Sequence, residues 1–182
     1  MKKFSFIMAL FAILALMFTG CPEEAEEDDD VFAELPATLE AAFPNTDTEG
    51  TEKTTIVLSG NNLTVTPGTG TPIEMNADLM NSAGVDLRAS IGLSFEYKTN
   101  IDCTLGFSDV GNMSSMFIAG WGSLVAVEDW TFVEIYFADI TTAWGTGNLD
   151  RSKIAKLWIG TGDTEPEADS KFELKDFAFI TQ

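Results

Sequence analysis

The chain has 182 residues, no histidine, 29 acidic against 10 basic residues, and a formal net charge of −19. The absence of imidazole excludes Ser-His-Asp and Cys-His hydrolase sites and the usual zinc sites. The acidic excess argues against a nucleic-acid partner, because nucleic-acid phosphates are bound mainly through Lys and Arg.

Residues 1–20 have the pattern of a secretory signal peptide. Two lysines precede a nearly continuous apolar run over residues 4–18. This run is shorter than the roughly 20 residues that span a membrane. The exit, Phe-Thr-Gly-Cys, resembles a bacterial lipobox, with Phe18 in place of the usual aliphatic residue. The resemblance implies that Cys21 is lipidated and becomes the new N-terminus; the alternative is an ordinary signal peptide with an incidental cysteine.

An acidic segment follows the cysteine. Residues 22–30 read PEEAEEDDD, so seven of nine are acidic. Dense like charge keeps a chain solvated and extended. We therefore expect residues 21–50 to be a disordered tether and lead-in, with weak helical character over 33–43, that holds a domain away from a surface. The alternative, a metal-binding tract, lacks any neighbouring residue that would fix its geometry.

Residues 51–182 are predicted to form one domain, with a turn at 59–62. Short runs of β-branched and aromatic residues, separated by turn residues, alternate with a period of two. This pattern, with no long helix, predicts an all-β antiparallel β-sandwich of the jelly-roll type. The expected strands are 54–58, 63–66, 91–98, 102–107, 115–119, 130–137, 154–159 and 171–180.

Cys103 is the second of two cysteines. If Cys21 carries lipid, Cys103 has no partner for an intramolecular disulfide, and the domain must be stable through its core alone. Its alternating position between Ile101 and Leu105 predicts a small buried hydrophobic residue.

Four segments in the last hundred residues match a known family in order and spacing. They are VDL followed by IGLSFEYK over 85–98, WTFVEIYFAD over 130–139, LDRSKI with LWI over 149–159, and FELKDFAF over 172–179. They resemble the strands of galactose-binding-like carbohydrate-binding modules. The resemblance implies a β-sandwich and a polysaccharide or glycan partner.

The same resemblance bears on metal binding. Members of this family often hold a structural calcium ion through an acidic pair before the last strand. Here that pair is Lys175-Asp176. Asp176 is therefore the one position at which the resemblance implies a calcium ligand, with its partner carboxylate lost. We expect no other cofactor.

One predicted sugar-binding face comes from strand alternation. In 130–137 the less apolar set places Glu134 and Tyr136 toward solvent, and in 154–159 Trp158 points away from the core. If both strands lie in one sheet, these three residues share a face. An aromatic ring can take the apolar face of a pyranose while a carboxylate binds its hydroxyls. In the alternative interpretation, the lead-in segment packs over Trp158 and removes it from the binding face.

Two further tryptophans, Trp121 and Trp144, lie in glycine-flanked loops and form a second candidate platform. They would lose that role if they folded under their own loops. Trp130 matches the recurrent tryptophan of the resembled family, and we expect it to have a packing role.

The sequence thus favours an exported, non-catalytic carbohydrate-binding protein of the bacterial cell envelope. We expect a monomer that contacts the membrane or cell surface through its lipid anchor only. The alternative is a structural or protein-interaction envelope lipoprotein with the same β-sandwich and no sugar site. A small glycosidase would need two carboxylates about 5–9 Å apart in a cleft. No pair of acidic residues in the sequence indicates such a catalytic site.

Overall fold

The computed structural model describes residues 32–47, 54–68, 73–162 and 164–181. The expected signal peptide, Cys21 and the acidic segment lie outside these residues. Within them, no helix has both the length and the apolar character needed to cross a membrane.

The described chain is built almost entirely from β-strands. One sheet, sheet A, contains β1 (Asn45–Asp47), β4 (Asn76–Val85), β6 (Thr104–Asp109), β7 (Met116–Ile118), β9 (Thr141–Trp144) and β10 (Ile154–Gly160). The other, sheet B, contains β2 (Thr55–Ser59), β3 (Asn62–Thr66), β5 (Ser90–Thr99), β8 (Val127–Tyr136) and β11 (Phe172–Thr181). The helical elements are α2 (Leu39–Ala42) and the 3-10 turns η1 (Phe137–Asp139) and η2 (Arg151–Lys153).

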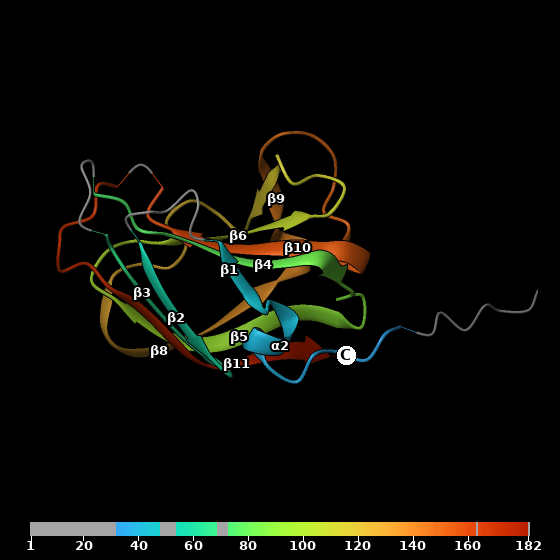
Figure 1. Cartoon of the computed structure of the whole chain (residues 1–182), viewed down its shortest axis with the longest axis horizontal. Helices are drawn as coiled ribbons and strands as arrows, with labels where there is room; N and C mark the ends of the chain where they lie inside the picture. The colour runs from blue at the N-terminus through green and yellow to red at the C-terminus, as the bar shows by residue number, and fades with distance from the viewer. Residues whose placement is uncertain (1–31, 48–53, 69–72, 163, 182) are drawn as a thin grey trace, which may run out of the picture. The chain divides into compact units, whose positions relative to one another are not determined.

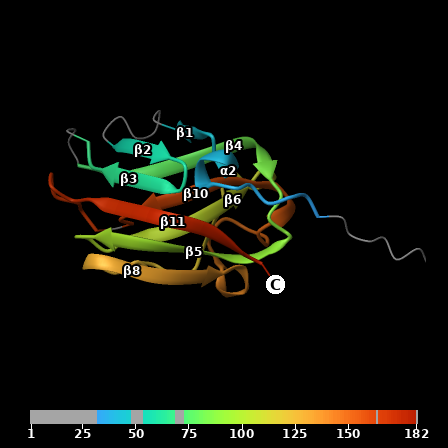
Figure 2. The same ribbon diagram turned by 90° about the horizontal axis from the view of Figure 1, so that it is seen from below.

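The two sheets form the layers of a sandwich (Figure 1). Sheet A has the order β1-β4-β10-β6-β7-β9, and sheet B has the order β2-β3-β11-β5-β8, which Figure 2 shows from top to bottom. All strand pairs are antiparallel. The predicted all-β antiparallel β-sandwich is therefore confirmed.

The core lies between the sheets and follows from period-two alternation. On β5 the inward residues Leu93 and Phe95 are at most 1% exposed, and on β10 the inward residues Leu157 and Ile159 are fully buried. These side chains belong to one hydrophobic cluster that receives residues from both sheets. Cys103 is fully buried in that cluster, as its spacing predicts.

The lead-in segment contributes to this core, although we placed the start of the domain at residue 51. Leu39 and Phe43 are buried with the sandwich residues. The hydroxyl of Thr38 accepts a hydrogen bond from the backbone N–H of Ala41 at 3.0 Å, which caps the short helix α2. β1 then pairs with β4 at the edge of sheet A.

The hairpin β2–β3 turns where the sequence predicts it. Ser59 pairs with Asn62, so Gly60 and Asn61 form a two-residue loop. Gly60 has a φ of +58°, which a glycine adopts without steric cost. The turn also holds the helix, because Leu39 donates its backbone N–H to the Asn61 side chain at 2.9 Å.

Candidate functional site

Three of the four tryptophans gather on the outer face of sheet A. Trp158 lies on β10, Trp144 ends β9, and Trp121 lies in the loop between β7 and β8. The Trp121 and Trp144 rings stack with centroids 5.7 Å apart and planes 22° apart. The Trp144 and Trp158 rings meet edge to face at 6.4 Å. We call these three residues the tryptophan cluster.

Trp158 is the buried member of the cluster, with 8% of its surface exposed. It packs with Met116 and Ile118 in a small hydrophobic group separate from the main core. The indole lies against the sheet because Gly160, two residues along the same strand, has no side chain: a methyl group there would collide with the indole. Trp158 is thus covered by its own cluster and by β7, not by the lead-in segment.

Trp121 and Trp144 are open to solvent, with 57% and 43% of their surfaces exposed. Trp144 is held by the pairing of β9 with β7, where it lies opposite Met116. Trp121 lies close to Gly162, since a methyl group at that glycine would be 3.4 Å from the indole. The two exposed rings therefore form a platform that rests on the buried Trp158. The structure brings the two predicted loop tryptophans together, and their role as a ligand platform stays a prediction.

Polar groups lie next to Trp158, beneath this platform. Asp78 on β4 is the direct cross-strand partner of Trp158. Its carboxylate accepts a hydrogen bond from the Lys156 ammonium at 2.9 Å, and both side chains retain about a fifth of their exposure. Lys156 lies on the same face of β10 as Trp158, two residues earlier. An aromatic surface next to a charged pair can contact both the C–H faces and the hydroxyl groups of a ligand.

The predicted joint face of Trp158, Tyr136 and Glu134 does not exist. β8 belongs to sheet B and β10 belongs to sheet A, so Trp158 lies on the opposite side of the sandwich from the other two. The condition for that face was that both strands share one sheet. Sequence alternation gives the face of a strand correctly, but it does not give the sheet to which the strand belongs.

Tyr136 and Glu134 do lie together on the outer face of sheet B. The Tyr136 hydroxyl donates a hydrogen bond to the Glu134 carboxylate at 2.8 Å. This hydrogen bond is the main cause of a raised pKa for Tyr136. The pair borders a pocket of about 210 Å³ that also includes Asp139 and Ser123.

Trp130 packs on the surface of sheet B and not in the core. It is 39% exposed on β8. The ammonium groups of Lys98 and Lys175 lie 4.9 and 4.6 Å from the centre of a Trp130 ring, so this indole is held by two cation–π contacts. Trp130 therefore provides an exposed tryptophan on the face opposite to the tryptophan cluster.

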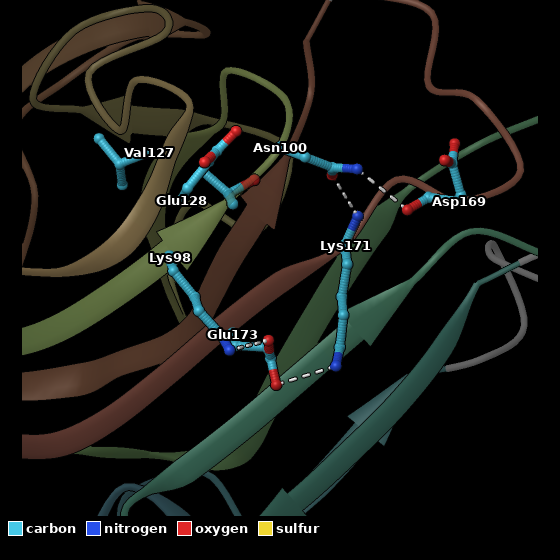
Figure 3. Close-up of a pocket in the computed structure, with 8 residues that line it drawn as sticks. Lys98, Asn100, Val127, Glu128, Asp169, Lys171 and Glu173 are labelled. Atoms are coloured by element: carbon cyan, nitrogen blue, oxygen red, sulfur yellow. Dashed lines mark hydrogen bonds and ion pairs between the residues drawn. The ribbon is translucent and has the colours of Figure 1, made fainter.

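A pocket of about 310 Å³ lies near these lysines, where β5 and β11 meet (Figure 3). Lys98 and Lys171 approach the Glu173 carboxylate from two sides, at 3.0 and 2.9 Å. The Asn100 side chain donates to the backbone carbonyl of Asp169 and accepts from the backbone N–H of Lys171. These contacts connect β5, β11 and the loop that precedes β11. Glu128, which lines the same pocket, makes no ion pair with a described residue.

The surroundings of Asp176 do not fit a calcium ion. Asp176 is exposed, has a φ of +53° at the irregular part of β11, and lies 3.8 Å from the Lys175 ammonium. Calcium takes six to eight oxygen ligands, mostly from several carboxylates and carbonyls. In the described part of the chain, no group of three or more acidic, Cys or His side chains is arranged to hold a metal. A cation beside Lys175 would be repelled.

Comparison with known proteins shows a similar fold in solved structures but assigns the sequence to no family. No protein-family model matches the sequence, and no curated protein matches it. The structure is similar to the family 11 carbohydrate-binding module of the cellulosomal cellulase Lic26A-Cel5E of Clostridium thermocellum: the TM-score is 0.50 at 17% identity, over 76% of this chain and 82% of that one. It is also similar to PfGH50B, with a TM-score of 0.52 at 13% identity, over 76% of this chain and 23% of that one. At these identities the likeness concerns the β-sandwich alone.

Proposed function

We propose that the protein is a non-catalytic carbohydrate-binding protein of the bacterial cell envelope. The observation that carries this proposal is the stacked and exposed pair of Trp121 and Trp144 on the outer face of sheet A. Exposed indoles that are held in place lose little conformational entropy when a ligand binds them. The similarity to a carbohydrate-binding module supports the same reading.

In this proposal the sugar rings lie on the open surfaces of Trp121 and Trp144, and hydroxyl groups hydrogen-bond to Asp78 and Lys156. Trp158 is a positioning residue, because it is buried beneath Trp144 and does not present a free ring face. A single shallow site of this kind buries little area, so we expect weak binding of an extended glycan. No pair of catalytic carboxylates is part of the proposal.

The test is a glycan array with the full chain, followed by calorimetry on the glycan that binds. Trp121→Ala and Trp144→Ala should each weaken binding about tenfold, which corresponds to about 1.4 kcal/mol. Trp130→Ala is the matched control, since it removes another exposed tryptophan from the opposite face. Binding that survives both cluster variants would refute this site, and loss of binding only in Trp130→Ala would move the site to sheet B.

The lipid anchor is part of the same proposal. Its support is the basic start, the apolar run and the lipobox-like exit before Cys21. We expect a mature chain that begins at Cys21 with thioether-linked lipid and partitions with membranes. Mass spectrometry of the mature N-terminus tests this expectation, and Cys21→Ser should release the chain from the membrane fraction. An unmodified Met1 would contradict it.

A second candidate function is protein interaction without a sugar ligand. It is favoured by Phe132, which is 61% exposed beside Trp130 on the outer face of β8. β8 is an edge strand, with β5 as its one neighbour in the sheet. Edge strands with exposed aromatic residues are common contact sites for other proteins. An empty glycan array together with a partner lost on Phe132→Ser would support this function instead.

A further inference from the structure

A pocket of about 400 Å³ is lined by residues that do not belong to the tryptophan cluster. Its apolar lining comes from Phe117 on β7, Phe137 and Ile140 around η1, and Leu149. Its polar lining comes from Thr142 on β9, Asn148 and Arg151. None of these lining residues belongs to the proposed glycan site or to a site predicted from the sequence.

Arg151 is unusual in a chain with a net charge of −19. No carboxylate among the described residues lies within ion-pair distance of its guanidinium. Lys153 likewise has no ion-pair partner among the described residues, whereas a carboxylate partner is present for each of Arg88, Lys98, Lys156, Lys171 and Lys175. The pocket is therefore lined by a cation whose charge no described residue neutralises.

The neighbouring acids are engaged elsewhere. Asp109 is 1% exposed and accepts hydrogen bonds from the Asn112 side chain and from the backbone N–H of Asp150. The Asp150 carboxylate accepts from the backbone N–H and the hydroxyl of Ser152. Both carboxylates thus have partners that do not include Arg151.

The guanidinium is also held in place. One of its terminal nitrogens donates a hydrogen bond to the Ser90 backbone carbonyl at 2.7 Å. Its carbon lies 5.5 Å from the centre of the Phe137 ring. A planar guanidinium fixed in this way keeps further N–H donors for an incoming acceptor, and its fork matches a carboxylate.

We propose that this pocket binds a carboxylate-bearing monosaccharide, with the carboxylate on Arg151. The apolar lining, including Phe137, suits the C–H face of a sugar ring, and the Thr142 hydroxyl and the Asn148 amide suit its hydroxyl groups. A singly charged ligand fits best, because one guanidinium has to overcome the repulsion of a strongly acidic protein. The volume lies within the range of about 300–1,000 Å³ that is usual for small-molecule pockets.

The experiment is isothermal titration of the full chain with D-glucuronate, D-glucose and acetate. We expect D-glucuronate to bind, and acetate to bind at least tenfold more weakly. Arg151→Gln should weaken D-glucuronate binding at least about tenfold, because it removes a charge-assisted pair. Since that variant also alters the hydrogen bond to Ser90, a second variant is needed.

Asn148→Asp is the second variant, because it keeps Arg151 and adds a carboxylate at an exposed position of the same pocket. It should weaken D-glucuronate binding several-fold, whereas Trp121→Ala should leave that binding unchanged. The proposal is overturned if D-glucuronate produces no binding heat, if both pocket variants bind it normally, or if acetate binds equally well. Loss of D-glucuronate binding in Trp121→Ala alone would assign it to the tryptophan cluster and also overturn the proposal.

Discussion

Trp158 on β10 and Asp78 on β4 are direct partners across an antiparallel pair, so a buried indole and a carboxylate lie side by side on the outer face of sheet A. Lys156 holds that carboxylate at 2.9 Å. The register of β4 against β10 thus places a charged pair next to the tryptophan cluster. This relationship connects the strand pairing to the proposed sugar contacts.

Asp78→Asn should weaken glycan binding several-fold while leaving the fold intact. The substitution keeps the shape of the side chain but removes the charge that binds Lys156, and we expect the free energy of unfolding to fall by no more than about 1 kcal/mol. Calorimetry and urea unfolding measure the two effects. Glu96→Gln is the matched control, because it removes the carboxylate partner of Lys175 on sheet B. Equal affinity in both variants would show that Asp78 does not contact the glycan.

Gly160→Ala should destabilise the tryptophan cluster. The added methyl group would collide with the Trp158 ring and with the Asn76 side chain, and overpacking of this kind costs about 1–3 kcal/mol. We expect a lower melting temperature and weaker glycan binding, because Trp144 rests against Trp158. Tryptophan fluorescence during thermal unfolding reports the change. A variant with wild-type stability and affinity would mean that the indole does not lie against Gly160.

Much of the sandwich was predictable because its strands carry strict alternation. The expected strand 91–98 corresponds to β5, and 154–159 corresponds to β10, with ends that differ by one residue. β4 was missed, because residues 76–85 read NADLMNSAGV and mix small and polar residues with few β-branched ones. Its inward residues Ala77 and Leu79 are fully buried, so tertiary packing forms this strand despite its composition.

The candidate site was predictable only in part. Glycine-flanked positions indicated that Trp121 and Trp144 lie in or next to loops, but they do not show that the two rings stack. Their contact with Trp158 depends on the pairing of β9 with β7 and of β10 with β6, which are long-range pairings that no local pattern encodes. Asp78 was missed together with its strand. The packing role expected of Trp130 came from the resemblance alone, which does not show that Lys98 and Lys175 contact its ring.

Cys103 should not react with thiol reagents in the folded protein. It is fully buried, and burial raises the pKa of its thiol to about 12, so the reactive thiolate is scarce at pH 8. The experiment uses Cys21→Ser, which leaves one cysteine in the chain. We expect one reactive thiol in denaturant and almost none in buffer. Rapid labelling in buffer would contradict the burial of this residue.

Glu173 should make stability depend on pH. Burial raises its pKa, but the hydrogen bonds from Lys171 and Lys98 outweigh burial and hold the pKa below its ordinary value. A carboxylate with a lowered pKa contributes stability above the pKa of the unfolded chain, and this contribution is lost as the pH falls through the folded pKa.

Glu173→Gln should therefore cost about 1 kcal/mol or less at pH 7, because two partly exposed ion pairs are lost. The difference from the wild type should shrink when urea unfolding is repeated in acid, where Glu173 becomes protonated in the folded state as well. Glu128→Gln serves as the control, since Glu128 is exposed in the same pocket and makes no ion pair with a described residue. A Glu173→Gln difference that persists unchanged at low pH would show that packing, and not charge, is responsible.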